Sequence, residues 1–280
     1  MENKGKMRLF DSHCHLDDRT FKADFQEVMT RSAKAEVNRM LIAGIDRATS
    51  GRAVDLAKRH TNIYASVGVH PHDANSCSEK ILAELEMLAA KPEVVAWGEI
   101  GLDFNRMYSP QRDQEKWFIR QLEVADRLSL PLIFHERDSD GRFLEMLKLT
   151  SAEHRNAVVH CFSGNRSELA AYLEMGFYIG ITGIVTHKKR GKKLREMLSE
   201  IPADRLLVET DAPYLTPSPQ RNKHRRNEPA FVRQVLLKVA EVRKDDPEKL
   251  SEQIWNNTCT LFRLDASERR DRALSNRRQR

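Results

Sequence analysis

Eight short apolar segments alternate with amphipathic segments along almost the whole chain, and this alternation limits the fold more than any other feature. The apolar segments have the length and β-branched content of buried strands, and the segments between them place apolar residues at helical spacing. The expected strands are 9–13, 40–43, 63–67, 94–98, 132–135, 157–160, 177–181 and 206–209. The expected helices are 24–35, 48–59, 78–90, 110–128, 142–149, 167–175, 192–200, 229–242 and 247–262.

A strand followed by a helix, repeated eight times without a long linker, is the pattern of an α/β fold of the (β/α)8 TIM-barrel type. A doubly wound open sheet shows a similar alternation. However, the Gly-x-Gly-x-x-Gly sequence that is typical of dinucleotide-binding sheets does not follow an early strand here. We therefore predict a single TIM-barrel domain over residues 1–264.

The excess of positive charge is concentrated at the C-terminus. The net charge is +6, and residues 266–280 contain six arginines against Glu268 and Asp271. This segment supplies four of the six excess charges, so the remainder of the chain is nearly balanced. We interpret 265–280 as an Arg-rich, disordered tail, and contact with nucleic-acid phosphates is the alternative interpretation.

Cysteine usage and hydropathy bear on the compartment. The four cysteines, Cys14, Cys77, Cys161 and Cys259, form no Cys-x-x-Cys pair, which favours a reducing environment. No apolar stretch is long enough to cross a membrane, and residues 1–8 lack the apolar core of a signal peptide. We therefore expect a cytoplasmic protein without membrane contact, and we take a monomer as the default state.

Histidines recur where the expected strands end. The first strand contains His13-Cys14-His15, and side chains at i and i+2 of a strand point to the same face, so both imidazoles can bind one metal ion. Such a pair is common on surface strands and carries little weight alone. Six of the ten histidines, however, fall at or just past strand ends, where TIM barrels place their chemistry. They are His13, His15, His70, His72, His135 and His160.

Mixed imidazole and carboxylate ligands on one face favour a binuclear hydrolytic metal site. The predicted ligands are His13, His15 and Asp211 for one ion, and His135 and His160 for a second. Glu99 follows the fourth expected strand and is the candidate bridge, since a carboxylate has two oxygens. Two divalent ions, Mg²⁺, Mn²⁺ or Zn²⁺, can bind a phosphodiester and generate the attacking hydroxide between them. We expect Glu99 and Asp211 to be catalytic, with Asp211 orienting the water and accepting its proton.

Two basic loops follow the seventh and eighth expected strands. They are 187–193, His-Lys-Lys-Arg-Gly-Lys-Lys, and 221–227, Arg-Asn-Lys-His-Arg-Arg-Asn. Loops at these positions of a TIM barrel often bind phosphate. A solvated charged surface is the simpler interpretation of either loop, and their position on the same rim as the metal ligands favours phosphate contact.

Several ordered motifs make the chain resemble TatD-type metal-dependent deoxyribonucleases across residues 8–262. The motifs are Asp-Ser-His-Cys-His-Leu at 11–16, Gly-Val-His-Pro-His at 68–72, Gly-Glu-Ile-Gly-Leu-Asp at 98–103, His-Cys-Phe-Ser-Gly at 160–164, Glu-Thr-Asp-Ala-Pro-Tyr-Leu at 209–215 and Arg-Asn-Glu-Pro at 226–229. Family members vary at the residue after His135, and this variation leaves the ligand intact. The tail beyond residue 264 is outside the family pattern.

This resemblance implies a TIM barrel of the amidohydrolase type that hydrolyses DNA with divalent metal ions, often as a 3′-to-5′ exonuclease on single-stranded ends. It implies the same ligand roles for the histidines and carboxylates named above. It also implies that further residues lie in or near the substrate cleft, namely His70, Asp103, Arg137, Glu209 and Asn227. RNA is a second candidate substrate, because discrimination against the 2′-hydroxyl depends on few contacts.

Two other functions suit parts of this pattern. The same fold and metals serve amide, lactone or small-nucleotide hydrolysis, and a fold does not by itself decide function. Many amide-cleaving relatives bridge their metals with a modified lysine from the fourth strand, whereas this chain offers Glu99 there. A nucleic-acid-binding protein with structural metals is the other alternative, but structural sites are normally closed by protein ligands. We therefore expect a deoxyribonuclease.

Overall fold

A computed structural model describes residues 7–150 and 155–264, and its centre is one sheet of eight strands in the order β1 to β8. The strands are β1 (Leu9–Cys14), β2 (Val37–Ile42), β3 (Ile63–Val67), β4 (Val94–Asp103), β5 (Leu132–Arg137), β6 (Ala157–Val159), β7 (Tyr178–Ile181) and β8 (Leu206–Val208). Each strand pairs in parallel with the next one in sequence. The predicted single-domain (β/α)8 barrel is therefore confirmed.

Backbone contacts between the first strand and the end of the last strand close the ring. The amide of Asp211 donates to the carbonyl of His13 at 2.9 Å, and the amide of His15 donates to the carbonyl of Ala212 at 2.7 Å. These bonds join β1 to the segment that follows β8. Closure removes the two free sheet edges, which would otherwise expose unpaired backbone groups.

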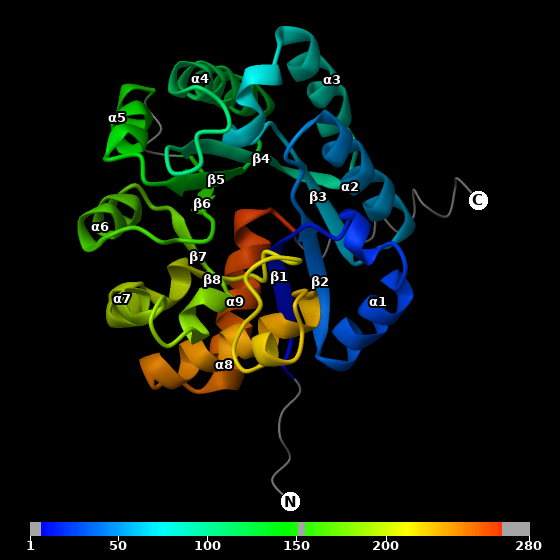
Figure 1. The fold of residues 1–280 in the computed structure, drawn as a ribbon, viewed down its shortest axis with the longest axis vertical. Coiled ribbons are helices and arrows are strands. Elements are labelled where there is room, and N and C mark those ends of the chain that lie inside the picture. Colours follow the sequence, from blue (N-terminus) through cyan, green and yellow to red (C-terminus); the bar gives the residue numbers. More distant parts are fainter. Residues whose placement is uncertain (1–6, 151–154, 265–280) are drawn as a thin grey trace, which may run out of the picture.

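Helices surround the sheet, and the view along the barrel in Figure 1 shows all but the last of them as an outer ring, whereas the last lies near the centre. They are α1 (Phe25–Lys34), α2 (Arg47–Arg59), α3 (Glu79–Ala89), α4 (Gln111–Leu128), α5 (Arg142–Leu149), α6 (Arg166–Glu174), α7 (Lys192–Met197), α8 (Val232–Arg243) and α9 (Pro247–Leu261). Several begin with side-chain caps. Asp46 and Thr49 form a capping box before α2, and Asn165 and Glu168 form another before α6.

One side chain from each strand fills the interior of the barrel on the N-terminal side of the strands. These residues are Phe10, Leu41, Tyr64, Ala96, Ile133, Val158, Tyr178 and Leu207, with Trp255 of α9 packed against them. Side chains two positions further along a strand point to the same face. The layer above Ile133, Val158 and Leu207 therefore contains His135, His160 and Glu209. The two-residue period of the strands thus places a layer of polar groups next to this apolar layer, toward the C-terminal ends of the strands.

Four expected boundaries differ from the structure by three residues or more. The second strand, expected at 40–43, begins at Val37. The fourth strand continues to Asp103, because Ile100 to Asp103 keep pairing with β5 beyond Gly98. Gly101, at φ +147°, permits this continuation, since a Cβ there would lie 1.8 Å from the carbonyl oxygen of His135. The helix expected at 192–200 ends at Met197 and continues as a 3₁₀ turn, Leu198–Glu200. The helix expected at 229–242 begins as a 3₁₀ turn, Pro229–Phe231.

Two further predictions concern membrane contact and the C-terminal tail. None of the helices in residues 7–150 and 155–264 is long and apolar enough to cross a membrane. The Arg-rich tail predicted for 265–280 lies outside the described residues, so its disorder stays a prediction.

An ion-pair network fixes the long loop after β8 against α1. Asp24, which precedes α1, accepts hydrogen bonds from Arg226 at 2.6 and 2.8 Å and from Arg31 at 3.1 Å. Arg31 also donates to both oxygens of Glu228. The hydrogen bonds from Arg226, supported by those from Arg31, lower the pKa of Asp24 to about 2. The loop that carries Arg226 and Glu228 is thus anchored at two points.

Asp24→Asn is expected to lower the free energy of unfolding at pH 7 by about 0.5–1 kcal/mol, because the pair is partly solvated. The folded pKa lies below the ordinary value of 3.8, so the stabilisation is present above pH 3.8 and is lost as the pH falls toward about 2. Urea unfolding of both proteins between pH 3 and pH 7 measures this difference. A difference between the two proteins that does not change over this range would contradict the assignment.

Candidate metal centre

Glu99 lies at the centre of a cluster of imidazoles at the C-terminal end of the barrel. Its Oε1 is 2.7 Å from Nδ1 of His135, 2.9 Å from Nε2 of His160 and 3.2 Å from Nε2 of His70. Its Oε2 is 3.3 Å from Nε2 of His13. Two residues of strands β1 and β5, and two residues that follow strands β3 and β6, therefore converge on one carboxylate of β4. This convergence is the arrangement predicted for a bridging ligand.

The ligands predicted for the first ion also meet. His15 Nε2 lies 3.3 Å from Asp211 Oδ1 and 3.3 Å from His13 Nε2, and His13 Nε2 lies 3.8 Å from the same Asp211 oxygen. Asp211 adopts φ +57°, a backbone conformation that non-glycine residues adopt rarely and mostly at functional sites. This turn directs its carboxylate toward the two histidines.

Three of the imidazoles are held from behind by an oxygen on their outer nitrogen. The pairs are His15 Nδ1 with the carbonyl of Ala43 (3.2 Å), His160 Nδ1 with Glu209 Oε1 (3.1 Å) and His135 Nε2 with Asp103 Oδ2 (3.2 Å). Metal-binding histidines usually have such a partner, which orients the ring and fixes the tautomer. The inner nitrogens, which face Glu99 and Asp211, remain available for divalent ions. The donor set therefore fits metal binding.

Electrostatics tie the carboxylate and the imidazoles together. Burial opposes the charge of Glu99, but His160, His70 and His13 outweigh it and hold the pKa of Glu99 well below its usual range. Burial likewise opposes protonation of His160, yet Glu99 and Glu209 raise its pKa well above the ordinary value. Divalent ions must displace protons from such histidines, so metal binding at this centre is coupled to proton release.

His70 differs from the other imidazoles in the cluster. Its Nδ1 accepts a hydrogen bond from the backbone amide of His72 at 3.0 Å, so the proton of the neutral ring is on Nε2, which faces Glu99. Burial lowers the pKa of His70 to about 3, which keeps the ring neutral. His70, Glu99 and His135 have ligand atoms within 4.8 Å of one another, but this tautomer makes His70 a hydrogen-bond donor toward Glu99.

Asp103 and Arg137, both predicted near the substrate, lie beside the cluster. The buried carboxylate of Asp103 contacts His72 Nε2 at 2.8 Å and His135 Nε2 at 3.2 Å. Burial opposes its charge, but the hydrogen bonds to His135 and His72 hold the pKa of Asp103 below its usual range. Arg137 pairs with Asp103 across β4 and β5 and is partly exposed. The structure therefore brings His70, Asp103 and Arg137 to the cluster.

Glu209 and Asn227 use their polar atoms within the protein. Glu209 is buried behind His160, accepts the amide of Cys161 at 2.6 Å, and occupies space that exists because residue 180 is glycine. Asn227 is buried and donates to the carbonyls of Thr210 and Tyr214 at 2.9 and 2.6 Å. Glu209 thus orients a metal ligand, and Asn227 shapes the backbone that carries Asp211.

Sequence reasoning missed two contributors, Asp11 and His72. His72 was recognised at a strand end but given no role, and it contacts Asp103. Asp11 is buried and accepts from the amide and hydroxyl of Thr210 at 2.8 and 2.6 Å, and burial raises its pKa to about 8. Its place at the start of the motif at 11–16, which also contains His13 and His15, was the signal that could have found it.

The two basic loops lie side by side in the fold. The buried ring of His187 donates through Nε2 to the carbonyl of Thr216 at 2.9 Å, and the amide of Ser218 donates to the hydroxyl of Thr186 at 2.7 Å. These bonds join the segment after β7 to the segment after β8. Apart from Arg226, which pairs with Asp24, the charged side chains of 187–193 and 221–227 are exposed, namely Lys188, Lys189, Arg190, Lys192, Lys193, Arg221, Lys223 and Arg225.

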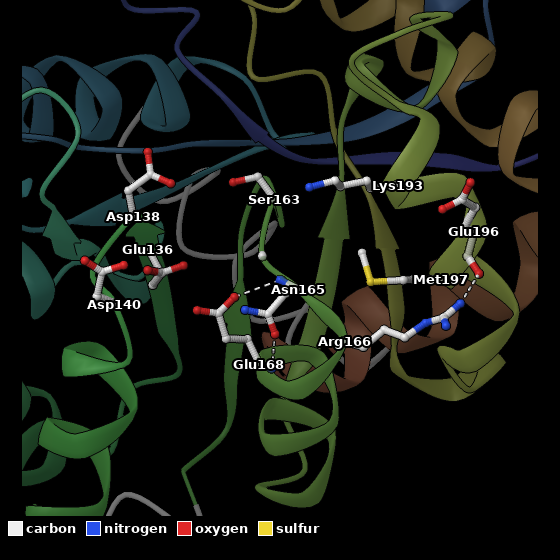
Figure 2. Close-up of a pocket in the computed structure, with 11 residues that line it drawn as sticks. Glu136, Asp138, Asp140, Ser163, Asn165, Arg166, Glu168, Lys193, Glu196 and Met197 are labelled. Carbon is white, nitrogen blue, oxygen red and sulfur yellow. Dashed lines mark hydrogen bonds between the residues drawn. The ribbon is translucent and has the colours of Figure 1, made fainter.

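A pocket of about 490 Å³ lies beside the metal centre, near the ends of β5 and β6 and the start of α7 (Figure 2). None of the predicted ligands lines it. Carboxylates dominate its wall, and Figure 2 shows Asn165 and Glu168 forming the cap of α6 within it. The acidic residues are Glu136, Asp138, Asp140, Glu168 and Glu196. These five carboxylates outnumber the two cations of the wall, Arg166 and Lys193, which disfavours nucleic-acid phosphates here. The other residues of the basic loops are therefore the better phosphate surface.

Comparison with known proteins identifies a family. The family described as "TatD related DNase" matches residues 10–263. A Klebsiella pneumoniae (strain 342) protein named "3'-5' ssDNA/RNA exonuclease TatD" is 42% identical over 261 residues, which cover 92% of this chain and 99% of the relative. A protein of the same name from Pantoea vagans (strain C9-1) is 44% identical over 259 residues, covering 91% of this chain and 100% of the relative.

A solved structure gives the same result at the level of the fold. The crystal structure of YJJV, a TatD homologue from Escherichia coli K12, aligns with a TM-score of 0.84 at 31% identity. The alignment covers 92% of this chain and 99% of the homologue. Because the family match spans nearly the whole barrel, and because the relatives match over almost their full length, this chain belongs to the TatD-related DNase family.

Proposed function

We propose that this protein is a divalent-metal-dependent exonuclease that hydrolyses single-stranded DNA, and RNA as a second substrate, from the 3′ end. The observation that carries the proposal is the convergence of His13, His70, His135 and His160 on Glu99, with His15 and Asp211 beside them. The names of the relatives support the direction and the single-stranded substrate.

The proposed centre binds two divalent ions. His13, His15 and Asp211 would hold one ion, His135 and His160 the other, and Glu99 would contact both through its two oxygens. When bound, the ions supply Lewis-acid stabilisation of the phosphodiester and lower the pKa of a water molecule. Mg²⁺, Mn²⁺ and Zn²⁺ all suit a set of imidazole and carboxylate ligands, and hydrolysis assays with each ion distinguish among them.

The protein's own groups have distinct parts in this proposal. Burial opposes the charge of Asp211, but hydrogen bonding to His15 and the charge of His160 lower its pKa, so its carboxylate is ionised at neutral pH and can accept a proton from the attacking water. His70 directs its Nε2–H toward Glu99 at 3.2 Å, and it would donate a hydrogen bond from there to a phosphate oxygen. Arg137 and the basic loops would bind the non-reacting phosphates.

The expected result is strictly metal-dependent removal of nucleotides from the 3′ end of a 5′-labelled single-stranded DNA oligonucleotide. Each of Mg²⁺, Mn²⁺ and Zn²⁺ is tested against EDTA, because removal of the ions removes the Lewis acid. A ladder that shortens from the 3′ end shows the direction of hydrolysis. The same oligonucleotide made of RNA measures the preference between the two sugars.

His135→Ala is the control for this assay. It removes one inner nitrogen that faces Glu99, while the strand around it stays packed. Because the variant is purified in the same way, any contaminating nuclease would be present in both preparations, and only activity of the protein itself should be lost. Cleavage by the variant at the wild-type rate, or absence of cleavage with every ion, would contradict the proposal. The second outcome would favour amide or lactone substrates. Cytoplasmic location and a monomeric state stay predictions of the sequence.

A further inference from the structure

Two tyrosines stand out among the aromatic side chains of the described residues. Tyr108 is 62% exposed and Tyr214 is 56% exposed. Every other Phe, Tyr and Trp within 7–150 and 155–264 is buried or partly buried. An isolated exposed tyrosine is ordinary on a protein surface. Both of these, however, contact histidines of the metal centre, which an unselected surface position does not explain.

The tyrosines lie at the two ends of a line of contacts across the mouth of the barrel. Tyr214 follows β8 and its ring is 5.9 Å from His15, and Tyr108 follows β4 and its ring is 4.8 Å from His72. Strands β4 and β8 are four positions apart in a ring of eight, so they lie on opposite sides. The contacts between the ends run through His15, His13, Glu99, His135, Asp103 and His72.

The backbone beside each ring is fixed, although the rings are exposed. The amide of Tyr214 donates to the carbonyl of Asp211 at 2.8 Å, and its own carbonyl accepts from Asn227 at 2.6 Å. Ser109, next to Tyr108, is buried and donates to the carbonyl of His72 at 2.7 Å. Each ring is therefore exposed while the backbone next to it is fixed by hydrogen bonds. These are the properties of an aromatic side chain on which a base can stack.

We propose that Tyr108 and Tyr214 stack on the unpaired bases on either side of the scissile phosphate, and so determine the preference for single strands. This inference rests on the proposed nuclease function. Aromatic rings bind bases of any identity through their faces, and only unpaired bases can be turned onto them. A base pair in a duplex would have to open before either nucleotide reached its ring. The two platforms therefore select strandedness without selecting sequence.

The test measures KM and kcat for a single-stranded oligonucleotide with Tyr108→Ala, Tyr214→Ala and the double variant. Each alanine variant should raise KM about 5- to 150-fold, the usual effect of losing one base–aromatic stack. The kcat should change less than twofold, because the reacting atoms keep their ligands. Tyr→Phe at either position retains the ring and should restore most of the affinity. The ratio of single-strand to duplex hydrolysis should fall in the double variant.

Met87→Ala is the matched control, since Met87 is 65% exposed on α3 and has no part in the site. A second measurement uses the unaltered protein with substrates that lack the terminal or the penultimate base. Each abasic substrate should raise KM to a similar extent, and alanine at the corresponding tyrosine should then add nothing. An alanine variant with wild-type KM, or abasic substrates bound as well as the parent, would overturn the inference.

A third measurement separates this inference from the nuclease proposal. Binding of an oligonucleotide with 2-aminopurine at its 3′ end is followed by fluorescence in EDTA, where hydrolysis does not contribute. Stacking on tyrosine should quench the fluorophore, and the double alanine variant should lose this quenching. Quenching without hydrolysis under any metal would support the platforms while contradicting the nuclease. Hydrolysis together with equal quenching in the unaltered protein and the double variant would support the nuclease while contradicting the platforms.

Discussion

Glu99→Gln is expected to reduce kcat on single-stranded DNA by at least about 10³-fold, because several kcal/mol of metal-dependent stabilisation is lost. The carboxylate contacts imidazoles on both sides of the centre, with distances of 2.7 Å to His135 and 3.3 Å to His13. A neutral amide offers a single weak ligand oxygen and cannot balance two cations. Calorimetric titration should therefore show loss of at least one bound ion.

A neighbouring glutamate provides the control for this variant. Glu136 is buried in β5 next to His135, and its carboxylate accepts from the amide and hydroxyl of Ser139. Glu136→Gln retains a carbonyl oxygen for these bonds and should keep wild-type kcat. Thermal unfolding of both variants tests whether lost activity comes from lost folding. A folded Glu99→Gln protein with more than a tenth of the wild-type kcat would be incompatible with the bridging role.

Asp211→Asn is expected to lower kcat by about 10²- to 10⁴-fold, the range associated with removing a general base. The melting temperature should change little, since an amide can still bond to His15 Nε2, now 3.3 Å from the carboxylate. The unusual backbone conformation at this position also suits asparagine, which tolerates positive φ better than most residues. Single-turnover hydrolysis at saturating metal measures the chemical step directly.

Counting bound ions distinguishes the two roles given to Asp211. Full metal occupancy with a slow chemical step assigns it as the proton acceptor, whereas loss of one ion assigns it mainly as a ligand. Asp138→Asn, which alters a carboxylate in the acidic pocket outside the centre, should leave both quantities unchanged. Wild-type turnover by Asp211→Asn would remove both roles.

The fold and the convergence of the predicted ligands at one end of the barrel were predictable because both follow from simple periods. Strand residues alternate between two faces, and the ends of parallel strands meet, so His135 and His160 could be brought together without coordinates. The extent of β4 was underestimated because glycine usually ends a strand, whereas Gly101 continues one where the neighbouring carbonyl comes too close for any side chain. This close approach is a tertiary property and leaves no local signal.

The finer roles of the site residues depend on loop packing that the sequence does not encode locally. Glu209 stands in the same motif as Asp211, and Asn227 stands in a separate motif without a ligand. The polar atoms of the two residues face His160 and two backbone carbonyls. Tyr108 and Tyr214 look like ordinary loop aromatics in the sequence. Their exposure and their histidine contacts result from the way two loops on opposite sides of the barrel fold back over its mouth.

The seam between β1 and the end of β8 has a consequence for the synthesis of the protein. Asp11 and Thr210, which bond across it, are 199 residues apart, and the ligands of the first proposed ion come from both sides of the same seam. A ribosome-bound chain that has not yet released the segment after β8 lacks Asp211. The growing polypeptide, which emerges beside its own messenger RNA, would therefore complete this proposed centre only after most of the chain has been made.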